Sequence, residues 1–214
     1  SKNMQTKYLF ATALSLSASI ALVIFRFYWA KEFTYLFLVW NLFLAFIPFV
    51  LSTIISSNNR LKNSKLLFIL FGLMWLLFLP NAPYIITDIK HLRPKSGLPL
   101  WYDIFVVFSF AWNGLLLAYL SISDMRKTAQ NLFGRWQANT FAAISLIACS
   151  FGIYLGRYLR WNSWDVFSQP KLVVYETYST FTQPFWESQA WGIVLVMSAF
   201  LLFTYPIFEM LRSK

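Results

Sequence analysis

Two segments hold most of the side chains that could do chemistry. The first, LPNAPYIITDIKHL at 79–92, carries Asp88 and His91 three positions apart. If this stretch is helical, both side chains lie on one face and could share a metal ion or a proton. Asp88 and His91 are therefore candidate catalytic groups. Asp103 follows a turn that contains Pro and Gly, and it could join them as a third metal ligand.

A metal site at these three residues would suit Mg or Ca better than zinc. His91 is the only histidine of the chain, and most zinc sites use more than one His or Cys. Carboxylate oxygens are the ligands of hard divalent cations. The structural alternative is that Asp88 caps a helix and His91 lies at the membrane interface. The sequence leaves the cofactor undecided between a divalent metal and none.

The second segment, GRYLRWNSWD, occupies 156–165. Arg157 and Arg160 share a face at helical spacing, and a pair of planar guanidinium groups suits a phosphate or carboxylate. Asp165 is a further candidate acid or base in the same segment. Two structural alternatives remain open. Both arginines could extend to lipid headgroups, or they could pair internally with Asp88, Asp103 or Asp165.

The elements that carry these segments are membrane-spanning helices. Of the 214 residues 58% are hydrophobic and only 12% are charged, against roughly a quarter charged in an average soluble domain. A span needs about 20 mostly apolar residues. Six runs come close, and they predict an all-α, polytopic helix bundle that forms one integral membrane domain over 1–214. The runs are Tyr8–Phe25, Phe33–Ile55, Leu66–Leu79, Ile104–Ile122, Thr140–Leu155 and Ala190–Phe208.

Prolines and loop lengths distinguish the two sides of the bundle. Pro80 and Pro83 predict that the third span is short and broken at membrane depth. The third loop (80–103) and the fifth (156–189) are long, aromatic and mixed in charge, and function is more often carried by such loops. The run Lys171–Thr182 is rich in β-branched and aromatic residues and predicts a short strand or hairpin arm outside the membrane.

Charge predicts the orientation but no nucleic-acid partner. The 18 Lys and Arg give a net charge of +10, yet they are scattered between apolar blocks and form no basic recognition element. With the N-terminus in the cytoplasm, that side holds ten of them and the other eight, which is a weak bias. The short basic loop Arg60–Lys65 favours cytoplasmic N- and C-termini. Both long loops are then extracytoplasmic.

Polar residues within the spans give little sign of a pathway. Asn41 and Asn113 are expected to form hydrogen bonds between helices, although a polar route through them would indicate a small transporter. Cys149, the only cysteine, is expected to be a small buried residue. The sequence has no HExxH, GxSxG, Walker or CxxC motif, so zinc-protease, serine-hydrolase and ATPase functions lose support.

At the same two segments the chain resembles DUF1361, a bacterial integral-membrane family of unknown function. The resemblance is carried by FLPNAPYIITDIKHL and GIYLGRYLRWNSWD and extends from the second span onward. It implies a multi-pass protein of the bacterial cytoplasmic membrane and supplies no substrate. The positions that match are Asn81, Pro83, Tyr84, Asp88, Arg157, Arg160, Asn162 and Asp165.

The leading hypothesis is one polar site where the third and fifth loops meet at the outer interface. Arg157 and Arg160, with Asn81, Tyr84 and Asn162, would hold an anionic lipid or lipid-linked phosphate. Asp88, Asp165 and His91 would act as acid, base or metal ligands, so the sequence does not decide whether the protein is an enzyme. The rival is a non-catalytic membrane subunit or scaffold, bound to a partner protein or to further copies of itself. A small transporter comes third.

Overall fold

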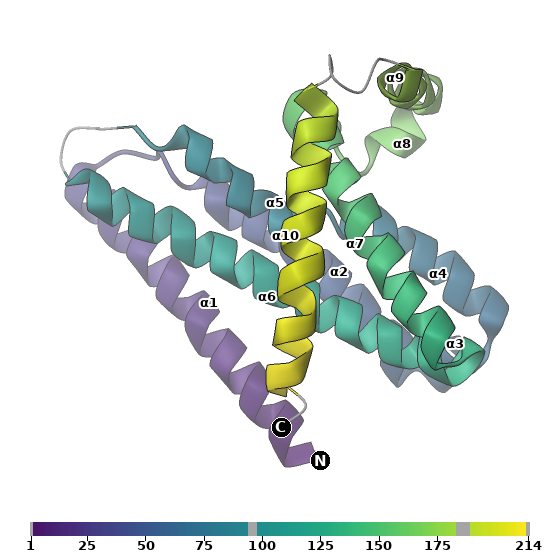
Figure 1. Cartoon of the computed structure of the whole chain (residues 1–214). Helices are drawn as coiled ribbons and strands as arrows, with labels where there is room; N and C mark the ends of the chain where they lie inside the picture. Colours follow the sequence, from purple (N-terminus) through teal and green to yellow (C-terminus); the bar gives the residue numbers. More distant parts are fainter. Residues whose placement is uncertain (1, 94–97, 183–188, 213–214) are drawn as a thin grey trace.

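The computed structural model describes residues 2–93, 98–182 and 189–212, and within these ranges it is all-α with no strand (Figure 1). Long helices alternate with short ones. In chain order the elements are α1 (Lys2–Ala30), α2 (Phe37–Ser57), α3 (Asn59–Asn63), α4 (Lys65–Phe78), α5 (Asn81–Tyr84), the 3₁₀ helix η1 (Ile85–His91), α6 (Leu100–Phe133), α7 (Arg135–Tyr158), α8 (Asp165–Ser168), α9 (Pro170–Thr182) and α10 (Gln189–Arg212).

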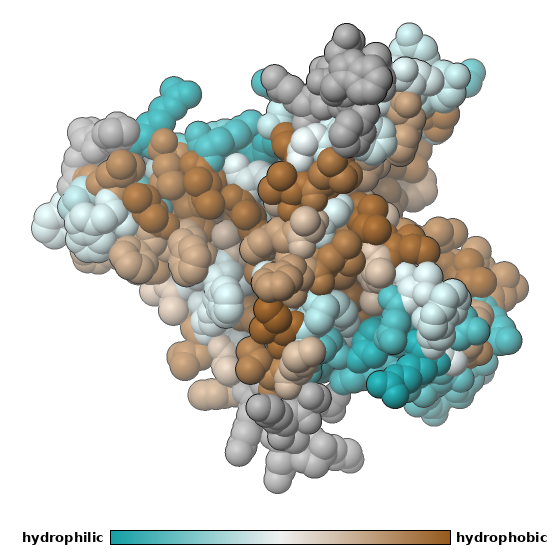
Figure 2. Space-filling view, viewed as in Figure 1, coloured by the Kyte–Doolittle hydropathy of each residue, from teal (hydrophilic) through white to brown (hydrophobic). Residues whose placement is uncertain are grey.

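The prediction of about six spans is confirmed. Six helical segments of the described chain are long and apolar enough to cross a membrane: Phe10–Ala30, Phe37–Ser57, Lys65–His91, Leu100–Phe133, Arg135–Tyr158 and Ala190–Arg212. Figure 2 shows hydrophobic residues over α10 and the neighbouring helices, and hydrophilic residues near α3 and the α6–α7 turn. Such an apolar belt between more polar ends is what a bilayer requires.

The longest helix, α6, lies at the centre of the bundle (Figure 1) and packs against α1, α2, α5, η1 and α7. Polar side chains join it to its neighbours. The amide of Asn113 donates to the Ser19 hydroxyl on α1 at 2.7 Å. The indole of Trp75 on α4 donates to Ser121 at 2.6 Å, and the Ser121 hydroxyl donates to the carbonyl of Pro48 on α2 at 2.9 Å. These interhelical bonds satisfy polar groups that hydrocarbon cannot.

The third span is interrupted at Pro80, as predicted, but the prediction that it is short is wrong. Regular α4 ends at Phe78, as the prolines require, but Leu79 and Pro80 keep helical backbone angles and the chain continues through α5 and η1 to His91. The whole span, Lys65–His91, has 27 residues. The φ angle of proline is compatible with a helix, so Pro80 and Pro83 interrupt the hydrogen-bond pattern without turning the chain back.

Helices α6 and α7 pack closely against the interrupted part of this span, each at a glycine. A Cβ on Gly114 of α6 would lie 2.2 Å from the carbonyl oxygen of Ala82, and a Cβ on Gly152 of α7 would lie 2.3 Å from Cγ of Pro80. Ala82 is fully buried. The two glycines let α6 and α7 close around α5, and this covering is what permits irregular backbone at membrane depth.

The prediction of a strand or hairpin arm at Lys171–Thr182 is also wrong, because Pro170–Thr182 forms the helix α9. Pro170 occupies the first helical position, where its missing N–H costs nothing. The hydroxyl of Thr180 donates to the Glu176 carbonyl one turn earlier at 2.9 Å. Local helix signals therefore outweigh the β-branched composition of the run.

The cytoplasmic position of both termini remains a prediction, and cysteine labelling can test it. Cys149 is buried, so a membrane-impermeant maleimide should report only on introduced cysteines. In intact cells Lys171→Cys on α9 should react, whereas Asn63→Cys on α3 should react only after lysis. The reverse pattern would show that the positive-inside assignment is inverted.

The close approach at Gly114 predicts a large effect from one methyl group. Gly114→Ala should lower stability by about 1–3 kcal/mol, because backbone must move to admit the Cβ. Thermal unfolding in mild detergent measures the change. Gly192→Ala is the matched control, since nothing lies within 4 Å of its Cβ position, and it should leave stability unchanged or raise it by up to about 1 kcal/mol. Equal effects of the two substitutions would contradict the enclosed arrangement of α5.

Candidate interfacial binding site

A buried ion pair joins the third span to α7. Nη2 of Arg157 lies 2.5 Å from Oδ1 of Asp88, and the two side chains are 6% and 2% exposed. The amide of Asn41 on α2 donates to the other carboxylate oxygen of Asp88 at 2.9 Å. Three helical elements, α2, η1 and α7, therefore meet at the Asp88 carboxylate. Both of its oxygens accept hydrogen bonds from protein side chains.

The rest of the Arg157 guanidinium is also occupied. Its Nε donates to the Thr87 hydroxyl at 2.7 Å, and its Nη2 contacts the same oxygen. Its carbon Cζ lies 4.2 Å from the centre of the Tyr84 ring, in a cation–π contact. The internal pairing with Asp88, left open by the sequence, is what the structure shows. With these contacts Arg157 has little capacity left for a ligand.

His91 lies at the exposed edge of this pair. Its Nε2 is 3.2 Å from Nη1 of Arg157 and 4.0 Å from Oδ1 of Asp88. A guanidinium can only donate, so Nε2 is the acceptor. Asp88 and His91 do face each other, as the spacing predicts, but the cation between them is Arg157. That position suits a guanidinium better than a divalent metal.

Asp103 does not join Asp88 and His91; it is bound to Arg26 of α1. Nε of Arg26 lies 2.7 Å from Oδ1 of Asp103 and Nη2 lies 3.2 Å from Oδ2, and both residues are 1% exposed. The ring of Tyr35 covers the guanidinium at 4.7 Å. Burial, reinforced by the Asp103 charge, raises the pKa of Tyr35 to about 12. The expected third metal ligand thus belongs to a separate α1–α6 contact.

A metal site gains no support from this geometry. Within 2–93, 98–182 and 189–212, no group of three His, Cys, Asp or Glu side chains is placed to hold a metal ion. The divalent metal at Asp88, His91 and Asp103 stays a prediction from the sequence.

Arg160 does not share a face with Arg157, which corrects the expectation from helical spacing. Helix α7 ends at Tyr158, and Arg160 has a φ of 59°, in the left-handed region that favours glycine. The N–H of Trp161 then donates to the Leu155 carbonyl at 3.2 Å, which folds the chain back over the helix end. Among the described residues, none forms an ion pair or hydrogen bond with the exposed Arg160 guanidinium.

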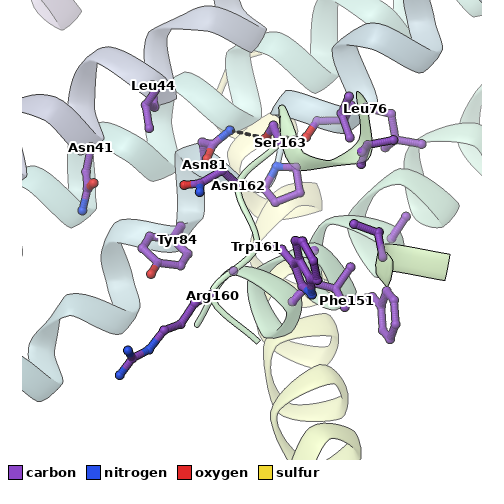
Figure 3. A pocket seen from close by; sticks show the side chains of 18 of the residues that line it. Asn41, Leu44, Leu76, Asn81, Tyr84, Phe151, Arg160, Trp161, Asn162 and Ser163 are labelled. Atoms are coloured by element: carbon purple, nitrogen blue, oxygen red, sulfur yellow. Dashed lines mark hydrogen bonds between the residues drawn. The ribbon is translucent and has the colours of Figure 1, made fainter. Parts of the chain in front are cut away.

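Arg160 lies at the edge of a cavity of about 460 Å³ between α2, the third span, α7 and the segment after α7 (Figure 3). Asn41, Asn81, Tyr84, Asn162 and Ser163 are its polar lining residues, and Arg160 is its only charged one among the described residues. Its apolar lining residues include Leu44, Leu76, Ala148 and Phe151. The volume lies within the usual range of ligand pockets, about 300–1,000 Å³.

The fifth loop closes over this cavity through Asn81 and Ser163. The Asn81 amide donates to the Ser163 hydroxyl at 3.0 Å (Figure 3), and that hydroxyl donates to the Leu77 carbonyl at 3.0 Å. Asp165 accepts from the N–H and amide of Asn162 at 2.7 and 3.1 Å. Asp165 is thereby used within its own turn and is not a lining residue.

Comparison with known proteins supports the resemblance of the two motifs. The model of the family described as "Protein of unknown function (DUF1361)" matches residues 40–204. The chain belongs to the DUF1361 family. No curated protein and no solved structure gives a match.

In this DUF1361 protein the structure adds residues that the sequence did not single out. Thr87 and Ser163 link the two motifs through side-chain hydrogen bonds, and Trp161 reaches α9 by donating to Glu176 at 2.5 Å. Asn41 was expected to bond between helices, but not to Asp88. The available signal was position alone, since Thr87 and Ser163 lie within the two matched segments.

Because Asp88 is in a buried ion pair and Asp165 is not, neutralising Asp88 should lower stability much more than neutralising Asp165. Asp88→Asn leaves the Arg157 charge buried without a counter-ion, so it should lower stability by about 3–5 kcal/mol and reduce the yield of folded protein. Asp165→Asn is the control, because Asp165 bonds only within its own turn, and it should cost about 1 kcal/mol. Thermal unfolding in detergent compares them. Similar stability of the two variants would show that the Asp88 pair is not a structural constraint.

Proposed function

We propose that this protein binds a phosphate-bearing anionic ligand, a lipid or a lipid-linked phosphate, in the cavity between the third span and α7. The observation that supports this most directly is Arg160. It is an exposed guanidinium without a protein partner among the described residues, at the rim of a cavity that has no acidic lining residue. An anion placed there meets one fixed positive charge and no negative one.

The two arginines of the motif take different roles in this proposal. Arg157 stabilises the wall through Asp88, Thr87 and Tyr84. Arg160 remains available for the headgroup at the edge of the cavity, which Tyr84, Asn162 and several apolar residues also line. A cavity lined by both polar and apolar residues matches an amphipathic ligand.

The backbone at Arg160 is a second argument for a ligand. A left-handed conformation costs a non-glycine residue roughly 1–2 kcal/mol, and glycine would remove that cost. Residues held in such conformations often belong to binding sites. The turn directs Arg160 away from the Arg157 face of α7 and so positions the one charged side chain that lines the cavity within the described part of the chain.

Binding is better supported than catalysis. A general acid or base must reach the reacting group, but Asp88 is 1% exposed and its oxygens are bonded to Arg157 and Asn41. Asp165 is used in its own turn. His91 is the one candidate acid or base that remains exposed, with 47% of its side chain accessible.

The non-catalytic subunit or scaffold remains the second proposal, and one observation favours it. The buried pair Asp88–Arg157 fixes η1 to α7, and the buried pair Arg26–Asp103 fixes α1 to α6. Such pairs are what a rigid platform for another membrane protein needs. A transporter gains no comparable argument, because Asn41 and Asn113 bond to different partners, Asp88 and Ser19.

Replacing Arg160 by glycine should separate binding from stability. Arg160→Gly removes the unpaired cation and the strained conformation together, so anionic-lipid affinity should fall about ten-fold or more while stability rises by about 1 kcal/mol. Native mass spectrometry with phosphatidylglycerol measures binding, and thermal unfolding measures stability.

Lys31→Gly is the matched control, because Lys31 is also a cation just beyond a helix end with a φ of 55°. It does not line the cavity. It should gain stability in the same way and keep the affinity of the wild type. If Arg160→Gly bound phosphatidylglycerol as tightly as Lys31→Gly, the anion site at Arg160 would be excluded.

A further inference from the structure

A second cavity, of about 280 Å³, lies between α4, α6 and α7 towards the end where α6 turns into α7. Its walls are almost entirely apolar and include Phe68, Leu73, Phe133 and Phe141. Gln137, near the start of α7, is its only polar lining residue among those described. A polar or charged ligand would find no partner in most of this space.

The two cavities meet at Leu76, which lines both of them. They follow the same two helices, since α4 residues on one side and α7 residues on the other line each cavity. On the third span the lining of the two cavities runs from Phe68 to Tyr84, which lies beside Arg160. Sixteen residues of helix correspond to roughly 24 Å, which is more than one leaflet of hydrocarbon, about 15 Å, and less than a whole core of about 30 Å.

We propose that the second cavity holds the apolar tail of a membrane lipid whose phosphate headgroup lies at Arg160. This deepens the proposed function and rests on it, because it identifies the ligand as a whole lipid rather than a soluble anion. The polar cavity, Leu76 and the apolar cavity then form one path, with charge at one end and hydrocarbon along the rest.

The apolar cavity is wide enough for a single hydrocarbon tail at Gly72. Gly72 contributes no side chain, and the nearest atom to its Cβ position, Cε of Met125, is 3.6 Å away. A partner helix is about 10 Å across with its side chains, too wide for a space of about 280 Å³. A soluble anion would gain nothing from apolar walls. A lipid tail fits the width and is already the solvent around these helices.

Photo-crosslinking can locate the tail. The protein is reconstituted in phosphatidylcholine nanodiscs that contain a small fraction of phosphatidylglycerol with a diazirine near the end of one tail. Peptide mapping should show crosslinks at Phe68 and Leu73 enriched about five-fold or more over the lipid-exposed Leu195 and Val196 of α10, because a shaped cavity retains a tail that bulk lipid exchanges. Leu195 and Val196 are 51% and 69% exposed.

Two glycine variants supply the matched comparison. Gly72→Leu fills the apolar cavity and should abolish the enrichment, while Gly192→Leu, where nothing lies within 4 Å of the Cβ position, should preserve it. Leu73→Trp is a second blocking variant in case Gly72→Leu does not fold, since Leu73 is 61% exposed and tolerates bulk; crosslinks are then read at Phe68.

Failure of this inference and failure of the proposed function give different results. Crosslinks at Phe68 no stronger than those on α10, or an enrichment that persists in both blocking variants, would overturn the tail site while leaving Arg160 untouched. A tail enrichment lost in Gly72→Leu but unchanged in Arg160→Gly would mean that the tail site is real and the headgroup contact is wrong. Loss in both Gly72→Leu and Arg160→Gly is the expected result.

Discussion

The desolvated charge pair between Asp88 and Arg157 is the constraint on which the site depends. Neither ion could remain buried without the other, so η1 must lie against the end of α7. Asn41 then has to reach the second carboxylate oxygen from α2. Arg157 therefore has its partners inside the protein, and Arg160 is the charged residue that lines the cavity in the described part of the chain.

The pair is brought together by packing farther along the same span. Gly114 and Gly152 let α6 and α7 approach α5 so closely that no Cβ fits on either. Pro80 is one of the contacted residues, and it leaves the backbone helical enough to continue to Asp88. Small residues on the neighbours and an interrupted helix between them are therefore two parts of one arrangement, and Asn81 and Tyr84 face the cavity as a result.

The six spans could be predicted because hydropathy over about 20 residues is a local property that the bilayer imposes. Which carboxylate pairs with which arginine could not be predicted. Arg157 had three carboxylates to choose from, and only the three-dimensional arrangement assigns Asp88 to it and Asp103 to Arg26. The predictions of a short third span and of a strand at Lys171–Thr182 were wrong for the same reason. Proline and β-branched residues lower helix propensity, but Pro80 and Pro170 occupy positions where a helix tolerates them.

Among the residues that the structure describes, Arg157 is paired inside the protein and Arg160 is not, and this difference follows from the left-handed φ angle of Arg160. Had α7 continued for one more turn, both guanidinium groups would face η1 and compete for Asp88, and the cavity would have no charge. The left-handed turn at Arg160 ends the helix, brings Ser163 to Asn81 and leaves one cation at the rim. Nothing in GRYLRW marks that turn, since it has no glycine or proline where the helix ends. A left-handed residue is an ordinary way for a helix to end, as Lys31 shows after α1, so what distinguishes Arg160 is its place at the cavity.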